Sequence, residues 1–300
     1  MPSLRSWFCR LIIKKVISPK LNNLQSIDET RNFMEKMAKY SKLPPGTQIE
    51  KITLNGIAAE WIYTNTAHEE RVVLFLHGGG YNLCSINTHR ELASYIARES
   101  GAKVLLIDYR LSPEHPFPAA LEDAVSAYHW LLGNGLSGKN IAIAGDSAGG
   151  GLTLATAISI RDAGDPLPSS IACIAPWTDL CMTGDSIQTK SKIDPLVKIH
   201  SAKIWAKNYI GDNDPSDPRI SPLYADLNIF PPLLIHVGTD DMLLDDSKRI
   251  AQKAEESGVN VELKIYEKMW HVFHLQVKAM PEAKNAIAEF GAFIKKHFDD

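Results

Sequence analysis

The sequence predicts an α/β fold in which a mostly parallel sheet is covered by helices on both faces. From about residue 72 onward, short apolar runs alternate with amphipathic stretches, a pattern typical of strands joined by crossover helices. The runs are apolar at nearly every position, as expected for strands buried on both faces. The 300 residues are 45% hydrophobic and 22% charged, so the chain can bury a large core without disulfides or metals.

The first 45 residues are predicted to form two helices ahead of the sheet. The first helix is expected over 3–17 because apolar residues recur there at helical spacing, namely Leu4, Trp7, Phe8 and Leu11. A second helix is expected to begin near Ser26, with Glu29 completing a capping box, and to end before Pro44.

Strands and helices then follow in regular order. Eight strands are predicted, over 48–54, 58–63, 72–76, 103–108, 141–145, 171–175, 233–237 and 261–266. The first two are expected to form a hairpin through Asn55-Gly56, a dipeptide that favours a type I′ turn. Helices are predicted over 88–100, 118–132, 148–162, 246–257 and 281–298. Thr88 and Glu91 are expected to form the capping box of the first of these helices.

One interval, 178–231, breaks this alternation. It contains one predicted helix, over 196–209, between loops rich in Asp and Pro. Insertions at the carboxyl edge of a parallel sheet often cover the site that lies there. We therefore expect this segment to form a roof over the site.

Composition and charge argue against several classes of protein. With 32 basic and 35 acidic residues the net charge is −3, so no basic surplus indicates nucleic-acid binding. No stretch is long and apolar enough to cross a bilayer. The apolar run near the start is interrupted by Arg10 and lacks a small-residue cleavage site, so no cleaved signal is expected. The four cysteines form no metal-binding spacing, which favours a reduced, cytoplasmic setting.

The strongest motif is Gly145-Asp146-Ser147-Ala148-Gly149, which matches G-x-S-x-G between a predicted strand and a predicted helix. The glycines permit a tight turn that lifts the serine hydroxyl out of the sheet edge. The start of the helix supplies free N–H groups and a positive dipole. A flexible turn with a solvated serine is the alternative, but the flanking strand and helix favour Ser147 as a nucleophile.

A second motif, His77-Gly78-Gly79-Gly80, directly follows the predicted strand over 72–76. Consecutive glycines let the backbone approach a ligand closely, and acyl transfer needs N–H donors that face the developing oxyanion. A plain turn or a phosphate-binding loop is the alternative, but no Gly-Lys-Ser/Thr follows as in a P-loop. His77 itself is expected to stabilise the loop.

A serine nucleophile needs a base, and the base needs an acid. His271 lies in a loop that leaves the carboxyl edge of the sheet, and His274 competes with it. A metal site formed by these two histidines lacks an evident third ligand. Four carboxylates follow the strand over 233–237: Asp240, Asp241, Asp245 and Asp246. Some of them are expected only to begin the next helix, where negative charge is favourable.

With these motifs in the order Ser, Asp, His, the chain resembles the hormone-sensitive-lipase-like group of α/β-hydrolase esterases, also called bacterial esterase family IV. The matching segments are 77–80, 109–120, 145–150, 176–179 and the Asp-x-Leu-x-Asp segment that begins at Asp241, with His271 after it. Together they cover about residues 45–298.

The resemblance implies a Ser-His-Asp mechanism that uses neither a metal nor an organic cofactor. It makes Ser147 the nucleophile, His271 the base and Asp241 the acid, and it leaves Asp245 to help begin the next helix. It also implies an oxyanion hole built from backbone N–H groups, in which Gly79 acts with Gly78 or Gly80 and with Ala148.

The resemblance further implies an α/β-hydrolase core, residues 46–177 and 232–300, with a helical cap. Residues 1–45 and the insertion 178–231 are expected to form that cap. The implied function is hydrolysis of carboxylic esters with short- to medium-chain acyl groups, because a roofed pocket is small. Trp177 either lines the acyl pocket or packs against the sheet edge.

Two other functions compete with this one. A non-catalytic binding module is disfavoured because all three residues of the expected triad are present. An amidase or peptidase could use the same triad, since leaving-group preference depends on the detail of the pocket. The expected partner is a small-molecule ester, and the sequence leaves a homo-oligomer open.

The first helix has two interpretations. It can be part of the cap, with its apolar side chains over the mouth of the site and its basic residues in water. It can instead be a peripheral membrane anchor, since residues 1–20 carry a charge of +5 without any acid: Arg5, Arg10, Lys14, Lys15 and Lys20. The apolar stripe is clean for only about two turns, so we favour the cap.

Overall fold

In a computed structural model that describes residues 2–22 and 26–299, the chain is built on one eight-stranded sheet. The strands are β1 (Thr47–Leu54), β2 (Ile57–Thr64), β3 (His68–Leu76), β4 (Ala102–Ile107), β5 (Ile141–Asp146), β6 (Ser170–Ile174), β7 (Leu233–Gly238) and β8 (Val261–Tyr266). Their order in the sheet is β1-β2-β4-β3-β5-β6-β7-β8. From β4 to β8 all neighbours are parallel, whereas β2 is antiparallel to both β1 and β4.

The predicted hairpin is confirmed: Leu54 pairs with Ile57, and the intervening Asn55 and Gly56 have φ of +49° and +87°. The largest difference among the strands is in β3, which begins at His68 and not at residue 72. The additional residues, 68–71, are polar, and a bulge separates them from the apolar residues 72–76. Because a bulge interrupts the alternation of side chains along a strand, the apolar pattern does not indicate that the strand begins at His68.

Helices precede the sheet, cover it and fill the insertion. They are α1 (Leu4–Ile12), α2 (Ser18–Asn22), α3 (Ile27–Ala38), α4 (Ile86–Ser100), α5 (Ala119–Gly133), α6 (Ala148–Ala163), α7 (Asp185–Thr189), α8 (Ile199–Ile210), α9 (Leu244–Glu256) and α10 (Pro281–Asp299). A π-helical turn (Ile13–Ile17) joins α1 to α2. The short helix α7 was not expected from the sequence, because five residues are too few to show a helical period.

The starts of α4, α8 and α9 differ from the prediction, and α9 begins at Leu244 and not near residue 246. The capping box of α4 consists of Ser85 and Thr88, and not of Thr88 and Glu91. The Ser85 side chain accepts a backbone N–H of the first turn, and Thr88 Oγ1 accepts the Ser85 N–H at 2.9 Å. Glu91 instead pairs with Lys278 at 2.8 Å. The helix expected over 196–209 begins at residue 199. The side chain of Asp194 accepts the N–H groups of Leu196 and Val197, so these two residues form a loop before the helix.

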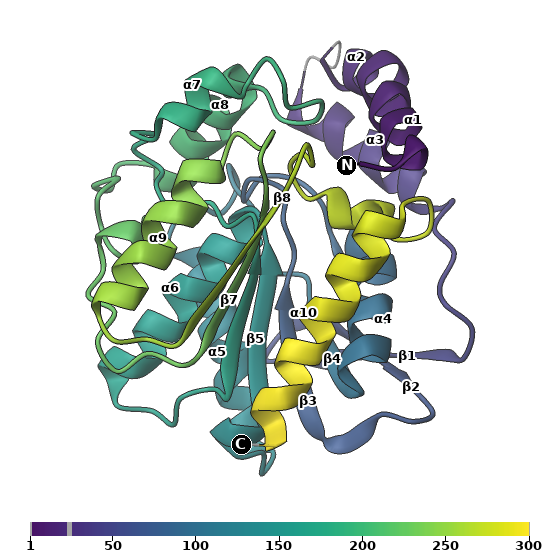
Figure 1. The fold of residues 1–300 in the computed structure, drawn as a ribbon. Coiled ribbons are helices and arrows are strands. Elements are labelled where there is room, and N and C mark those ends of the chain that lie inside the picture. Colours follow the sequence, from purple (N-terminus) through teal and green to yellow (C-terminus); the bar gives the residue numbers. More distant parts are fainter. Residues whose placement is uncertain (1, 23–25, 300) are drawn as a thin grey trace.

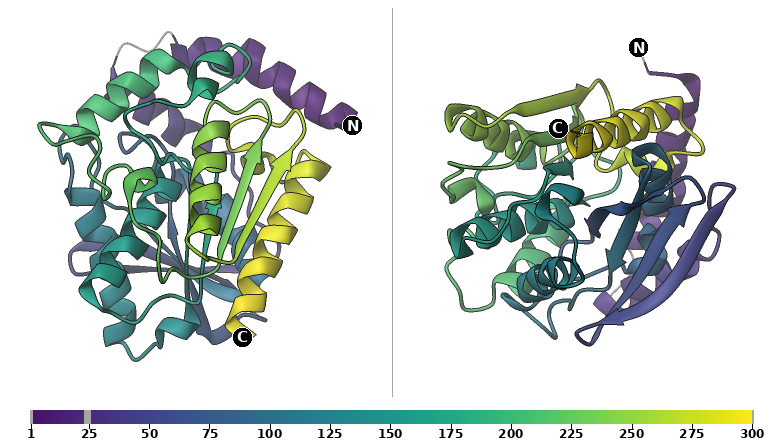
Figure 2. Two further views of the ribbon diagram at one scale, coloured as in Figure 1. Left: turned by 60° about the vertical axis from the view of Figure 1, so that its left-hand side comes forward. Right: turned by 90° about the horizontal axis from the view of Figure 1, so that it is seen from below.

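The sheet is the central layer between two layers of helices (Figures 1 and 2). α4 and α10 pack on one face, against a cluster that includes Val73 and Phe75. α5, α6 and α9 cover the other face, where Leu74 and Leu76 lie. Alternate residues of β3 therefore serve opposite layers, as the period of a strand requires.

The first helices and the insertion lie at one end of the molecule, where Figure 1 shows α1, α2, α7 and α8. α1 packs through Ser6 and Arg10, and the next turn through Ile13, while Leu4 and Trp7 are 80% and 57% exposed. The expected covering of the site mouth by the apolar stripe is therefore wrong. No helix in the described ranges is long and apolar enough to span a bilayer.

Candidate active site

The turn between β5 and α6 holds Ser147 in an unusual conformation, with φ +55° and ψ −122°. A positive φ is uncommon for a residue with a side chain, and it directs the serine out of the sheet edge. The flanking glycines have a steric reason. A Cβ on Gly149 would lie 2.0 Å from the Leu76 carbonyl oxygen, and one on Gly145 would lie 2.4 Å from the Gly149 oxygen.

Three side chains form a continuous hydrogen-bonded series at this edge. Ser147 Oγ lies 2.8 Å from His271 Nε2. His271 Nδ1 lies 3.0 and 3.2 Å from the two carboxylate oxygens of Asp241. The three residues follow β5, β8 and β7, whose carboxyl ends meet at the same edge. This arrangement allows proton transfer from the hydroxyl to the imidazole.

The neighbouring histidine has a different environment. His274 is buried, and its Nε2 lies 3.3 Å from His236 Nδ1. Burial and the adjacent imidazole lower the pKa of His274 well below its usual range. His274 is thus a neutral residue of the core.

The pair of histidines is not a candidate metal site in the described ranges. The one set of three side chains there that could jointly bind a metal ion consists of Asp194, Asp241 and His271.

The four carboxylates after β7 separate into different roles. Asp240 pairs with Arg10 of α1 at 2.5 Å, and Asp241 contacts His271. Besides the imidazole, Asp241 contacts the backbone, since its Oδ1 also accepts the Leu243 N–H at 2.8 Å. This contact orients the carboxylate before any substrate binds.

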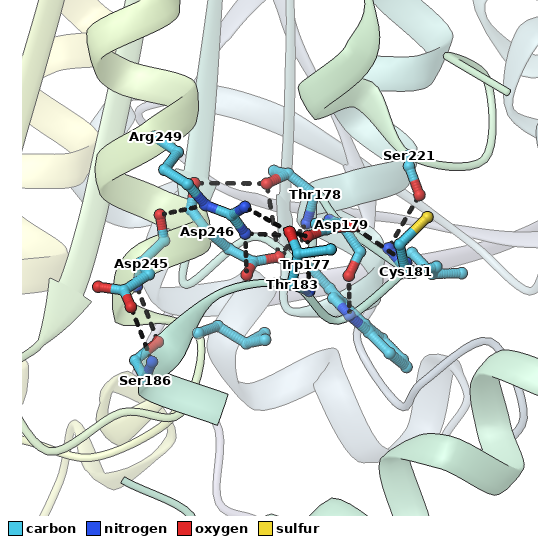
Figure 3. Close-up of polar contacts among 12 residues, drawn as sticks. Trp177, Thr178, Asp179, Cys181, Thr183, Ser186, Ser221, Asp245, Asp246 and Arg249 are labelled. Atoms are coloured by element: carbon cyan, nitrogen blue, oxygen red, sulfur yellow. Dashed lines mark hydrogen bonds and ion pairs between the residues drawn. The ribbon is translucent and has the colours of Figure 1, made fainter. Parts of the chain in front are cut away.

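The other two carboxylates begin α9 and attach it to the insertion (Figure 3). Asp245 accepts the backbone N–H of Ser186 at 2.7 Å. Asp246 is buried and accepts the N–H groups of both Thr178 and Asp179 at 2.9 Å. These bonds fix the start of the insertion to the helix that follows the loop of Asp241.

The glycine run after β3 is close to Ser147 but is not uniform. The Gly78 N–H already donates to the Asp146 carboxylate at 3.0 Å, so it is not free to bind an oxyanion. The expectation for Gly78 must be corrected accordingly. The N–H groups of Gly79, Gly80 and Ala148 have no hydrogen-bond acceptor in the part of the chain that the structure describes.

Beneath this loop, His77 is buried and stacks on Tyr109 with ring centroids 4.3 Å apart. Tyr109 donates its hydroxyl proton to the His77 carbonyl at 2.6 Å, and His77 Nδ1 lies 2.8 Å from the Gly78 oxygen. Burial lowers the pKa of His77 to about 3. A neutral ring that stacks on Tyr109 and is hydrogen-bonded through Nδ1 is suited to supporting the loop.

A narrow cavity adjoins Ser147 and His271. Its apolar wall combines residues of the core and of the insertion: Trp177, Val197, Ala202, Trp205, Met242 and Leu243. The Trp205 ring packs so closely on the glycine run that a Cβ on Gly80 would lie 2.6 Å from it. Trp177 thus lines the cavity, and its indole N–H donates to the Asp179 carbonyl at 3.2 Å.

Electrostatics at His271 favour the charged form. Burial alone would lower the pKa of His271, but the hydrogen-bonded Asp241 carboxylate and then Asp194 raise it above the usual range.

Asp194 was not predicted from the sequence as a residue of the site. It lies 77 residues before His271 and accepts that residue's backbone N–H at 3.2 Å. An isolated Asp-Pro in a loop rich in Asp carries no signal of such a contact.

Comparison with known proteins gives consistent findings. Residues 73–275 match a family described as having the alpha/beta hydrolase fold. An acetyl-hydrolase of Streptomyces hygroscopicus is 40% identical over 253 residues, which cover 84% of this chain and 83% of that protein. An esterase of Acinetobacter venetianus is 36% identical over 289 residues, covering 96% and 95% of the two chains. The crystal structure of an esterase from the bacterial hormone-sensitive lipase family has a TM-score of 0.94 at 40% identity, covering 99% of both chains.

Proposed function

This chain is a carboxylesterase of the alpha/beta hydrolase fold family, among the hormone-sensitive-lipase-like esterases, and we propose a catalytic triad for it. The proposed catalytic residues are Ser147, His271 and Asp241. The observation that supports this assignment is the continuous series of hydrogen bonds from Ser147 Oγ through the imidazole to the Asp241 carboxylate. Because these groups are already in contact, little reorganisation precedes reaction.

Acylation begins when His271 Nε2 takes the hydroxyl proton of Ser147 and Oγ attacks the ester carbonyl carbon. The carbonyl oxygen becomes an oxyanion, which the N–H groups of Gly79, Gly80 and Ala148 stabilise. Asp241 holds the Nδ1–H tautomer of the imidazole and stabilises the imidazolium.

The tetrahedral intermediate then collapses. His271 gives its proton to the leaving alkoxide, the C–O ester bond breaks, and the acyl group stays on Ser147. Water enters, His271 removes one of its protons, and the hydroxide attacks the acyl carbon. A second collapse releases the carboxylic acid and returns the proton to Ser147 Oγ. The balance is one ester and one water to one acid and one alcohol.

The substrates of this site are small-molecule esters with short- to medium-chain acyl groups. The narrow apolar cavity beside Ser147, closed by Trp177 and Trp205, supports this acyl size. Initial rates on p-nitrophenyl esters from acetate to palmitate, with Ser147→Ala as control, test the proposal. The rate should decline from butyrate or hexanoate toward palmitate. A maximum at palmitate would contradict the assigned acyl size.

The same triad could act on amides, so the leaving group needs its own measurement. A p-nitroanilide and a p-nitrophenyl ester with the same acyl group isolate this difference. We expect the ester to react at least a hundredfold faster, because p-nitrophenoxide can leave as a stabilised anion whereas the anilide nitrogen must be protonated by His271 as the C–N bond breaks. Comparable rates would favour an amidase.

The chain is also proposed to divide into a core, residues 46–177 and 232–300, and a cap formed by 1–45 and 178–231. Val197, Ala202 and Trp205 of the insertion contribute one wall of the cavity, which supports a cap role for that segment. The N-terminal helices lie at the same end of the molecule (Figure 1). Residues 1, 23–25 and 300, which this division also includes, lie outside the described residues.

We further propose that α1 makes peripheral contact with anionic lipid surfaces. Its outward stripe is apolar and exposed, comprising Leu4, Trp7, Phe8, Leu11 and Ile12. Arg5, Lys14 and Lys15 lie beside this stripe and form no ion pair with any residue that the structure describes. An exposed apolar stripe flanked by unpaired cations matches the interfacial region of an anionic bilayer.

A further inference from the structure

A buried carboxylate from the insertion joins the loop of His271 to a wall of the cavity. Asp194 is fully buried in the segment before α8. Its Oδ2 accepts the backbone N–H of His271 at 3.2 Å. Its Oδ1 accepts the N–H groups of Leu196 at 2.8 Å and Val197 at 3.2 Å. One side chain therefore binds two backbone segments that are distant in sequence.

Both segments reach the reaction site. Val197 lines the cavity together with Ser147 and His271. Leu196 packs on the cluster that contains Trp270, the residue before His271. Since Asp194 holds the backbone of each segment, its carboxylate sets the distance between the acyl-binding wall and the imidazole.

The same carboxylate is close to the proposed acid and base. Oxygen atoms of Asp194 and Asp241 and a ring nitrogen of His271 all lie within 4.8 Å of one another. An imidazolium formed during the reaction is therefore adjacent to two carboxylates. In a buried site a negative charge at this distance stabilises the charged ring strongly.

Other charged groups near Asp194 act on backbone atoms. Lys198, on the same loop, donates to the Asp194 carbonyl at 2.9 Å. Arg10 of α1 donates to the Ile193 carbonyl, also at 2.9 Å. Asp146, the residue before Ser147, raises the pKa of His271 as Asp194 does. Burial, with Asp241 next, raises the pKa of Asp194 itself to about 6.

We propose that Asp194 is a positioning residue of the esterase reaction, which fixes His271 relative to the cavity wall at Val197 and supplies a second negative charge beside the imidazolium. The inference rests on the proposed triad. It goes beyond that triad by giving the insertion a direct part in the chemistry, in addition to its role as a roof.

The test compares Asp194→Asn and Asp194→Ala with the wild type and with Asp214→Asn. Asparagine keeps the size of the side chain and one acceptor oxygen but removes the charge. Asp214 is a matched control because it is an exposed carboxylate of the same insertion, and its side chain is hydrogen-bonded only to Ser216 among the described residues. The readouts are kcat and KM per titrated active site, the pH profile of kcat/KM, and Tm.

We expect kcat to fall about tenfold in Asp194→Asn and up to about a hundredfold in Asp194→Ala, the scale of loss that misplaced catalytic groups produce. Asp194→Asn removes a negative charge beside the ring, so protonation of His271 becomes less favourable. The acid limb of the kcat/KM profile should therefore move to lower pH in this variant. Asp214→Asn should match the wild type in both measurements.

An acid limb that stays in place in Asp194→Asn, or a lower Tm with unchanged kcat per active site, would overturn the proposal and leave a merely structural residue. If Asp194→Ala does not fold, Asp194→Asn still decides the question. Failure of the triad itself is distinguished by Ser147→Ala, which would then retain activity whatever the Asp194 variants do.

Discussion

At the scale of single residues, the turn at Ser147 concentrates both steric strain and chemistry. Its positive φ is tolerated because two backbone bonds surround it: Ser147 N donates to the Ile174 oxygen at 2.8 Å and Trp177 N donates to the Ser147 oxygen at 2.9 Å. The conformation is therefore imposed by neighbours and not by the serine side chain. Changing that side chain should alter reactivity and not the fold.

Ser147→Ala is accordingly expected to lower kcat by a factor on the order of 10⁶. The reason is loss of the nucleophilic oxygen, since alanine occupies the same backbone conformation. Steady-state hydrolysis of p-nitrophenyl butyrate measures the loss, and circular dichroism with Tm provides the control for folding. A folded variant that kept a tenth of the wild-type rate would exclude Ser147 as the nucleophile.

The two histidines and the two adjacent acids should separate in kinetics. His271→Ala should approach the loss of kcat seen with Ser147→Ala, whereas His274→Ala should mainly lower Tm, because His274 packs in the core beside His236.

Asp241→Asn should reduce kcat about 10⁴-fold, because the amide no longer holds the imidazole in the tautomer that accepts the Ser147 proton. Asp240→Asn loses only its pair with Arg10. A reversed order within either pair would mean that the base or the acid is misassigned.

The pH dependence of kcat/KM should have an acid limb set by His271. The ring must be neutral to accept the Ser147 proton, so activity is lost as pH falls through its pKa. Asp241 favours the protonated ring and raises that pKa. The midpoint should thus lie above the ~6.5 of an unperturbed histidine. A pH titration of kcat/KM in constant-ionic-strength buffers checks this, and a midpoint below 6 would contradict it.

At the scale of elements, α1 turns a polar residue toward the protein and an apolar stripe toward the solvent, whereas a helix packed on a core usually does the opposite. Arg10 faces inward, where it binds Asp240 and the carbonyls of Ile193 and Lys268. With these polar contacts on the inner side, the apolar stripe of Leu4 and Phe8 faces out. The helix thus attaches to the loops of the site through these bonds and through Cys9, which packs on the cluster of Trp270, and its exposed apolar face is left for another surface.

Trp7→Ser with Phe8→Ser should therefore reduce co-sedimentation with phosphatidylglycerol vesicles at least tenfold, because the two rings are 57% and 56% exposed and belong to the apolar stripe that would enter the lipid interface. Ile229→Ser is the matched control, since Ile229 is 80% exposed but lies far from α1 in sequence. Hydrolysis of soluble p-nitrophenyl acetate should not change. Phosphatidylcholine vesicles should bind the wild type less.

Two outcomes would contradict a lipid-binding α1. One is equal sedimentation of the wild type and the double variant. The other is a concentration-dependent dimer in analytical ultracentrifugation that the double variant abolishes, which would show that a second copy of the chain covers this face.

At the scale of the whole molecule, the site lies between the sheet edge and the insertion. The core contributes Ser147, Asp241 and His271 through loops after parallel strands, and the insertion contributes Asp194 and the wall at Trp205. Bonds between Asp246 and the start of the insertion hold these two parts together (Figure 3). Substrate size is therefore a property of their relative position.

Trp205→Ala should shift the acyl preference toward longer chains, because removal of the indole opens the cavity beside Gly80. We expect kcat/KM for p-nitrophenyl octanoate relative to acetate to rise several-fold. Ile204→Ala, a neighbour on the same helix with a 42% exposed side chain, should leave the ratio unchanged. An unaltered ratio in Trp205→Ala would show that this indole does not limit acyl length.

Much of this molecule follows from local patterns. The alternation of apolar runs predicted the α/β class, and the motifs predicted the family; both are confirmed. Strand and helix positions agree closely with those expected, because burial on both faces and a helical period leave clear marks in the sequence. Boundaries at bulges and side-chain caps, such as those of β3 and α4, do not leave such marks.

The sequence by itself determined the fold, the family and the residue types at the sheet edge: a serine in a glycine turn, two histidines and four carboxylates. Only the tertiary structure decided which of these groups touch, and that the Gly78 N–H is bound by Asp146, that Asp194 meets His271, and that α1 turns its apolar stripe outward. The physical reason is range. Backbone conformation depends on neighbours in the chain, whereas a buried polar group takes whichever partner the packing of distant segments brings within about 3 Å.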